Sequence, residues 1–207
     1  MYQEDSQMKR LVMIVCVAVG SISIFAACQN DSPDPKMQEN NLQSEDAVET
    51  SSEKPKKVEV PLKDKDDVEI GGVIFQEADN GVQVNVQVTH LEEGSYGIHI
   101  HDKGVCEPPS FESAGDHFNP DDRKHGFYNQ EGPHKGDMEN LKVDEDGEAD
   151  QMYMNEFVTL KKGEPNSLIT KEGTSVIIHE EEDDYMTQPA GDAGDRIYCG
   201  VISPPEK

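Results

Sequence analysis

Basic side chains are scarce in this sequence. Its 18 lysines and arginines stand against 43 aspartates and glutamates, which gives a formal net charge of −25. Because nucleic acid binding requires a basic surface that neutralises phosphates, this deficit argues against a nucleic acid partner. It also argues against electrostatic docking on anionic lipid head groups. Such an acidic excess is typical of a soluble chain that carries an acidic, disordered segment.

Helical periodicity is also lacking. After residue 56 no segment repeats apolar residues every 3.6 positions, and the absence of βαβ alternation argues against a solute-receptor lipoprotein. Residues 82–88 instead alternate apolar and polar side chains directly after an Asp-Asn-Gly turn. The sequence predicts an all-β domain, an antiparallel Greek-key sandwich or barrel. We expect strands at 58–62, 72–77, 82–88, 97–102, 148–154, 175–179 and 197–202.

Two connections between these strands are unusually long, at residues 103–140 and 180–195. Long loops in a compact domain are usually functional, so we expect the site there.

The chain has a single long apolar run, residues 11–25, which is short for a membrane-spanning helix. Lys9 and Arg10 precede it and small residues follow, as in a secretory signal. The segment Phe25-Ala26-Ala27-Cys28 resembles the bacterial lipoprotein box. That resemblance implies a signal peptide over residues 1–27, a lipid such as palmitate on Cys28, and export to the outer side of a bacterial membrane. Ordinary secretion is the alternative.

Residues 28–56 contain almost no aromatic or branched apolar side chains. Such a segment cannot bury enough apolar surface to offset the entropy lost on ordering. We expect a disordered acidic tether here, followed by one domain over residues 57–207.

Of the four cysteines, Cys16 falls in the signal segment and Cys28 at the lipid site. Cys106 and Cys199 remain in the exported domain, where a disulfide is favoured because the compartment is oxidising. A pair of thiolate metal ligands is the alternative.

Six of the seven histidines fall in or beside the predicted strands and long loops. His99 and His101 are two residues apart on a predicted strand, so both rings point to one face and could grip one metal ion. His179 ends a second apolar strand. Two solvated surface histidines are the alternative for the pair at 99 and 101.

A second set comprises His117, His125, His134 and Asp137, which lie within 21 residues among several glycines. Glycine allows a loop to fold tightly enough to bring these side chains together. Three imidazoles and a carboxylate make a closed tetrahedral set, which is typical of structural zinc; a solvated loop is the alternative. Together, six histidines and one carboxylate suffice for two metal ions, and imidazole suits both copper and zinc.

These motifs resemble the copper/zinc superoxide dismutases, most closely the exported bacterial branch, and the resemblance covers residues 58–202. The segments that carry it, in family order, are Gly97-Ile98-His99-Ile100-His101, Ser113-Ala114-Gly115-Asp116-His117-Phe118-Asn119-Pro120, Lys124-His125-Gly126, Gly132-Pro133-His134-Lys135-Gly136-Asp137 and Gly191-Asp192-Ala193-Gly194-Asp195-Arg196-Ile197-Tyr198-Cys199-Gly200-Val201-Ile202.

The resemblance implies a role for each matching residue. His117 bridges the two ions, Asp183 accepts hydrogen bonds from one copper and one zinc histidine, and Arg196 attracts the superoxide anion. Cys106 and Cys199 match the family disulfide. The implied ligands are His99, His101, His117 and His179 for copper, and His117, His125, His134 and Asp137 for zinc. The implied reaction converts superoxide to oxygen and hydrogen peroxide, with a homodimer left open.

One departure concerns charge near the site. Glu180-Glu181-Glu182 directly follows His179, where family members usually carry some positive charge. A negative rim repels an anion. We therefore expect superoxide to associate more slowly than with relatives that carry positive charge near the site. This rim keeps a second function open: a dismutase-like lipoprotein that binds zinc or copper with little or no turnover.

Overall fold

The computed structural model describes residues 56–207. The expected signal peptide, the lipid site at Cys28 and the tether therefore lie outside the described residues. Within 56–207, nine strands account for nearly all regular structure, and no helix is long and apolar enough to cross a bilayer. The elements are β1 (Lys57–Lys63), β2 (Glu69–Ala78), β3 (Gly81–Val88), β4 (Gly94–Tyr96), β5 (Ile98–His101), the 3₁₀ turn η1 (Glu112–Ala114), β6 (Leu141–Val143), β7 (Ala149–Asn155), β8 (Thr174–His179) and β9 (Arg196–Ser203).

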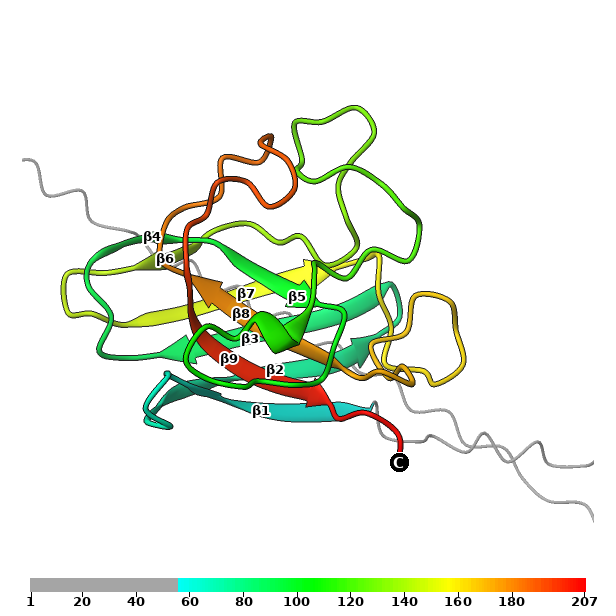
Figure 1. Ribbon diagram of the computed structural model, residues 1–207, viewed down its shortest axis with the longest axis horizontal. Helices are drawn as coiled ribbons and strands as arrows, with labels where there is room; N and C mark the ends of the chain where they lie inside the picture. Colours follow the sequence, from blue (N-terminus) through cyan, green and yellow to red (C-terminus); the bar gives the residue numbers. More distant parts are fainter. Residues whose placement is uncertain (1–55) are drawn as a thin grey trace, which may run out of the picture. The chain divides into compact units, whose positions relative to one another are not determined.

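All strand pairs are antiparallel. Seven strands form one curled sheet in the order β5-β8-β9-β1-β2-β3-β7, and β4 pairs with β6 in a second, two-stranded sheet (Figure 1). The neighbours β5–β8, β9–β1 and β3–β7 are distant in sequence, as Greek-key connections require. The prediction of an all-β, antiparallel fold is confirmed.

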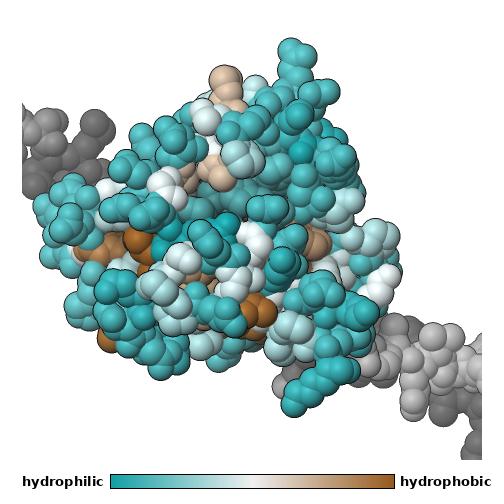
Figure 2. Space-filling model, in the orientation of Figure 1, coloured by the Kyte–Doolittle hydropathy of each residue, from teal (hydrophilic) through white to brown (hydrophobic). Residues whose placement is uncertain are grey.

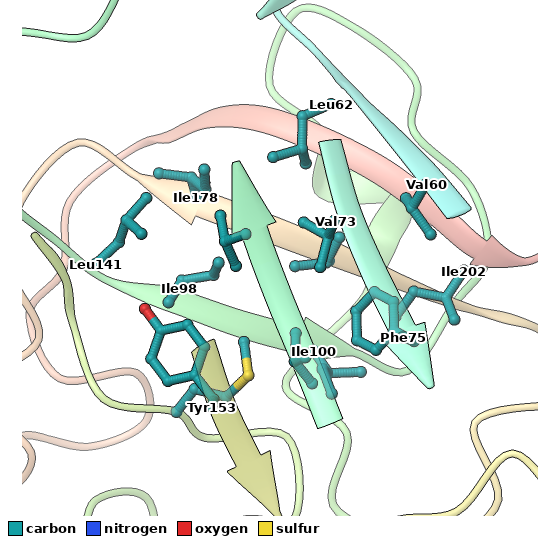
Figure 3. Close-up of a cluster of buried hydrophobic side chains, with 14 of the residues drawn as sticks. Val60, Leu62, Val73, Phe75, Ile98, Ile100, Leu141, Tyr153, Ile178 and Ile202 are labelled. Atoms are coloured by element: carbon teal, nitrogen blue, oxygen red, sulfur yellow. The ribbon is translucent and has the colours of Figure 1, made fainter. Parts of the chain in front are cut away.

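The core lies inside the curve of this sheet. Alternate side chains of β3 are fully buried, because a strand with one solvated face buries every second residue. Figure 3 shows Phe75, Ile98 and Tyr153, which come from three different strands, in one cluster of buried side chains. Ile98 and Ile100 belong to this core, which fixes the register of β5.

The seven strands expected from the sequence are all present, with ends that differ by a few residues. Two three-residue strands, β4 and β6, were not predicted because three residues are too few to establish an alternating pattern. A third long connection, residues 156–173, joins β7 to β8 and was also missed.

The two predicted long loops rise from the same end of the sheet (Figure 1). They are tied to each other: the Tyr128 amide donates to the Tyr185 carbonyl at 3.2 Å, and the Gln188 side chain both donates to and accepts from the His125 backbone at 2.9 Å. The exterior seen in Figure 2 is mostly hydrophilic, with a few separate apolar patches. The loops therefore act as one layer over the end of the strands, where the histidines gather.

Candidate metal centre

The site is built on β5, whose edge is extended by the first long loop. The Phe118 amide donates to the Ile100 carbonyl, and the Ile100 amide donates to the Gly136 carbonyl, both at 2.8 Å. Isolated bridges then place His101 opposite His117 and His99 opposite Asp137. Backbone hydrogen bonds thus bring side chains from three parts of the chain to one point.

Two glycines are required for this close packing. A Cβ at position 136 would collide with the Ile100 carbonyl oxygen. Gly191 has a φ of 71°, and a Cβ there would meet the carboxylate of Asp183. Any larger residue at either position would push the loops away from the histidines.

The structure brings all seven ligand candidates together in two buried groups. In each group, one potential ligand atom per residue lies within 4.8 Å of every other. His117 belongs to both groups, and its ring centroid lies 4.1 Å from that of His99 and 5.5 Å from that of His134. The groups are His99, His101, His117 and His179, and His117, His125, His134 and Asp137.

Each of these six histidines has a buried ring nitrogen with no hydrogen-bond partner, while its other ring nitrogen is either held by an oxygen or left toward solvent. A buried polar atom without a protein partner costs free energy, so a convergent set of such atoms indicates a ligand-binding site. Nδ1 of His125 and of His134 lie 3.1 and 3.2 Å from the Asp137 carboxylate without forming a hydrogen bond. The unpaired atoms are Nδ1 of His99, His125 and His134 and Nε2 of His101, His117 and His179. The donor set therefore fits two metal ions.

Oxygen atoms behind the rings fix their orientation. Asp183 is buried, and its two carboxylate oxygens accept from Nε2 of His99 at 2.8 Å and from Nε2 of His125 at 3.0 Å. Nδ1 of His101 donates to the Gly115 carbonyl at 3.0 Å. Such partners set the tautomer of each ring and so decide which nitrogen faces the metal.

Asn140 was not predicted from the sequence, yet it holds Asp183 in place. Its side-chain amide donates to the Asp183 carbonyl, and its side-chain oxygen accepts from the Asp183 amide, both at 2.9 Å. A single asparagine at the end of a loop carries no spacing signal, so only the folded structure identifies it.

The protonation states suit metal binding. Burial and the neighbouring His99 lower the pKa of His117 to about 3, and burial with the same neighbour lowers the pKa of His179 to about 2. Both rings are therefore neutral at pH 7, which is the form that binds metals. Burial would raise the pKa of Asp137, but the adjacent His117, His125 and His134 hold it well below its usual range.

A cavity of about 610 Å³ opens onto the first group of histidines. Arg196 lines it and lies opposite His179 in the β8–β9 ladder. Its guanidinium donates to the Phe111 carbonyl at 2.8 Å and to the Gly115 carbonyl at 2.7 Å. Within residues 56–207 it forms no ion pair with an acid, so its charge remains available to an anion in the cavity.

The acids of the predicted rim are not part of the cavity lining. Glu180, Glu181 and Glu182 are exposed and do not line the cavity. The acids that do line it are Asp102 and Asp116, which sequence reasoning did not single out.

Cys106 and Cys199 form the expected disulfide, which closes a 93-residue separation. Phe111 and Ala114 pack with Ile177 and Cys199 in a small second core beside it. The disulfide thus secures the segment whose carbonyl groups hold Arg196. The alternative of two thiolate metal ligands is excluded.

An antiparallel curled sheet whose loops gather two adjacent ligand groups, with one histidine in both, defines a dinuclear metalloprotein. A family model described as copper/zinc superoxide dismutase matches residues 69–202. The chain therefore belongs to the copper/zinc superoxide dismutase family, and copper and zinc are its metals.

Among its relatives, copper–zinc superoxide dismutase 2 of Aquifex aeolicus is 48% identical over 134 residues, which cover 64% of this chain and 78% of the relative. The superoxide dismutase-like protein YojM of Bacillus subtilis is 36% identical over 197 residues, covering 94% of this chain and 96% of that protein.

Solved structures agree with the family assignment. A crystal structure of a superoxide dismutase-like protein from Bacillus subtilis matches with a TM-score of 0.68 and 38% identity, covering 70% of this chain and 97% of that one. The copper/zinc superoxide dismutase of Brucella abortus matches with a TM-score of 0.60 and 26% identity, covering 71% and 99%.

Proposed function

We propose that this protein catalyses the dismutation of superoxide at a copper ion joined through His117 to a structural zinc ion. The observation that carries the proposal is the set of six buried ring nitrogens that have no partner and converge in two groups. The copper ligands are His99, His101, His117 and His179. The zinc ligands are His117, His125, His134 and Asp137.

When bound, copper supplies one-electron redox chemistry, so that one superoxide is oxidised to dioxygen and a second is reduced and takes up two protons to give hydrogen peroxide. The residues of the chain provide binding and geometry. Arg196 attracts the substrate anion, and its guanidinium stays charged at any working pH. Asp183 holds His99 and His125, one ring from each metal group, in fixed orientations.

The proposed location is the outer side of a bacterial membrane, with lipid on Cys28. The motif Phe25-Ala26-Ala27-Cys28 supports this location, and a disulfide between Cys106 and Cys199 is consistent with an oxidising compartment. The test is incorporation of labelled palmitate by cells that express the chain. Label that is lost in the Cys28→Ala variant supports the anchor, whereas equal label in both proteins contradicts it.

One observation favours a second function. A relative that matches 94% of this chain carries the name superoxide dismutase-like protein, which leaves turnover open. The rival is a lipoprotein that holds zinc or copper with little or no turnover.

Metal content per chain, measured together with a dismutation assay, separates the two functions. One copper and one zinc per chain with rapid turnover supports the enzyme. Zinc alone, with no activity after copper is added, supports the rival.

A further inference from the structure

The charged lining of the cavity is unusual for a site that admits an anion. Among the described residues, its charged side chains are Arg196, Asp102 and Asp116, beside four histidines. Two carboxylates therefore face one guanidinium.

Hydrogen bonds hold the Asp102 carboxylate and the backbone of Asp116 beside each other. The Asp116 amide donates to Oδ1 of Asp102 at 3.1 Å, and the Asp102 amide donates to the Asp116 carbonyl at 2.9 Å. Each aspartate directly follows or precedes a histidine of the first group, His101 or His117. Asp102 is half-buried and Asp116 is exposed, so one carboxylate lies in the wall and the other nearer the opening.

Neither aspartate forms an ion pair with Arg196, whose guanidinium is held by the carbonyls of Phe111 and Gly115. The aspartates still act on the same space, since unit charges without direct contact interact through the cavity. Among the side chains that line the cavity, one guanidinium is therefore outnumbered by two carboxylates, whatever charge a bound metal adds.

We infer that Asp102 and Asp116 determine which anions reach the metal, because they repel ions in proportion to their charge. This inference rests on the proposed function. Coulomb energy scales with ligand charge, so a repulsion that slows a monoanion such as superoxide by some factor disfavours a dianion by about the square of that factor. The two carboxylates thus repel phosphate-like anions more strongly than superoxide. Specificity of this kind comes from unfavourable interactions with the wrong ligand.

The test measures anion binding to the full chain loaded with copper and zinc. Azide is titrated by its absorbance change at the copper, and phosphate is measured at pH 8 by competition with azide. The variants are Asp102→Asn, Asp116→Asn and the double variant, because asparagine keeps Oδ1 as an acceptor and removes only the charge. Glu182→Gln is the matched control, since it removes one charge from the exposed run outside the cavity.

We expect the double variant to bind azide about threefold or more tighter, and phosphate about ninefold tighter. The control should match the wild type for both anions. Equal affinities in wild type and double variant, or an equal gain in the control, would overturn the inference.

Dismutation measured against salt concentration separates this inference from the proposed function. The wild-type rate should stay level or rise with salt, while the double variant should lose rate, since salt then screens mainly the attraction of Arg196. Tighter azide binding without dismutation in any variant contradicts the proposed function alone. Dismutation with anion affinities that do not respond to the two substitutions contradicts the inference alone.

Discussion

At the scale of single residues, the site depends on which nitrogen of each imidazole is free. His179 is a clear case: Nδ1 lies 3.4 Å from the Gly194 carbonyl, and Nε2 is buried without a partner. His117 differs, because its Nδ1 lies 2.9 Å from Asp137 in the second group while its Nε2 has no partner. One neutral ring has a single free nitrogen lone pair, so His117 can serve both groups only if it loses its remaining proton on metal binding.

Replacing His179 tests the division between the groups. His179→Ala should reduce dismutation below detection while zinc stays bound, because His179 belongs only to the first group. Zinc content by mass spectrometry and the dismutation rate are measured on the same sample. His90→Ala is the control, since His90 is exposed and outside both groups. Full activity in His179→Ala would remove this residue from the copper shell.

Arg196 is the second residue whose role a substitution can isolate. Arg196→Ala should lower the dismutation rate by about tenfold or more with both metals in place, because the cavity then loses its one positive side chain. Arg196→Lys keeps the charge and should retain more of the rate. An unchanged rate in Arg196→Ala, with full metal content, would show that this guanidinium does not guide the substrate.

At the scale of elements, strands and ligands were predictable to different degrees. The alternating pattern of β3 and the spacing of His99 and His101 predict a strand and a shared face, because strand geometry has a period of two. Loop residues have no such period. The folded path of the loop beside β5 brings Asn140, Asp102 and Asp116 to the site. Sequence spacing could not predict these positions. Family resemblance supplied Asp183 and Arg196: Asp183 lies between His99 and His125, and Arg196 lines the cavity.

Asp183 connects β5 to the first long loop through His99 and His125. Asp183→Asn should weaken binding of both metals by about 10- to 100-fold, because an amide cannot accept hydrogen bonds from two rings as a carboxylate does. Competition with a chelator measures each affinity. Asp184→Asn is the neighbouring control, since Asp184 is exposed and its carboxylate accepts hydrogen bonds only from Met186 and Thr187. A loss confined to one metal would contradict the connecting role.

The disulfide is the other link between elements. It joins β9 to the segment that carries Phe111, and its closed loop spans 93 residues. Replacing both Cys106 and Cys199 with serine should lower the free energy of unfolding by about 2–5 kcal/mol. Denaturant titration of oxidised wild type and the double variant measures this difference. Equal midpoints and slopes would show that the crosslink adds no stability.

At the scale of the whole molecule, the metal-free fold should respond to pH through its buried histidines. His117 and His179 have folded-state pKa values of about 3 and 2, below the ordinary value of 6.5. The unfolded chain therefore binds more protons below pH 6.5, and the stability present above that pH is lost as the pH falls toward 3. Burial opposes protonation of His125, but Asp137 and Asp183 outweigh it and raise its pKa to about 9. The stability that protonated His125 contributes is already fully present below pH 6.5. It therefore does not offset the loss caused by His117 and His179.

Thermal unfolding in the presence of a chelator tests this pH dependence between pH 6.5 and 4. The melting temperature of the wild type should fall with pH, and His179→Gln should show a shallower fall because one depressed pKa is removed. His90→Gln should follow the wild type. Identical slopes in all three proteins would contradict the assignment of the acid sensitivity to the buried cluster.

The whole account depends on one imidazole that touches two different metals. Crystals of the protein loaded with copper and zinc, with diffraction data collected on either side of both absorption edges, locate each element separately. We predict a copper peak beside Nε2 of His117 and a zinc peak beside Nδ1 of the same ring. A single metal peak, zinc in both positions, or a His117 ring turned away from either ion would contradict the account.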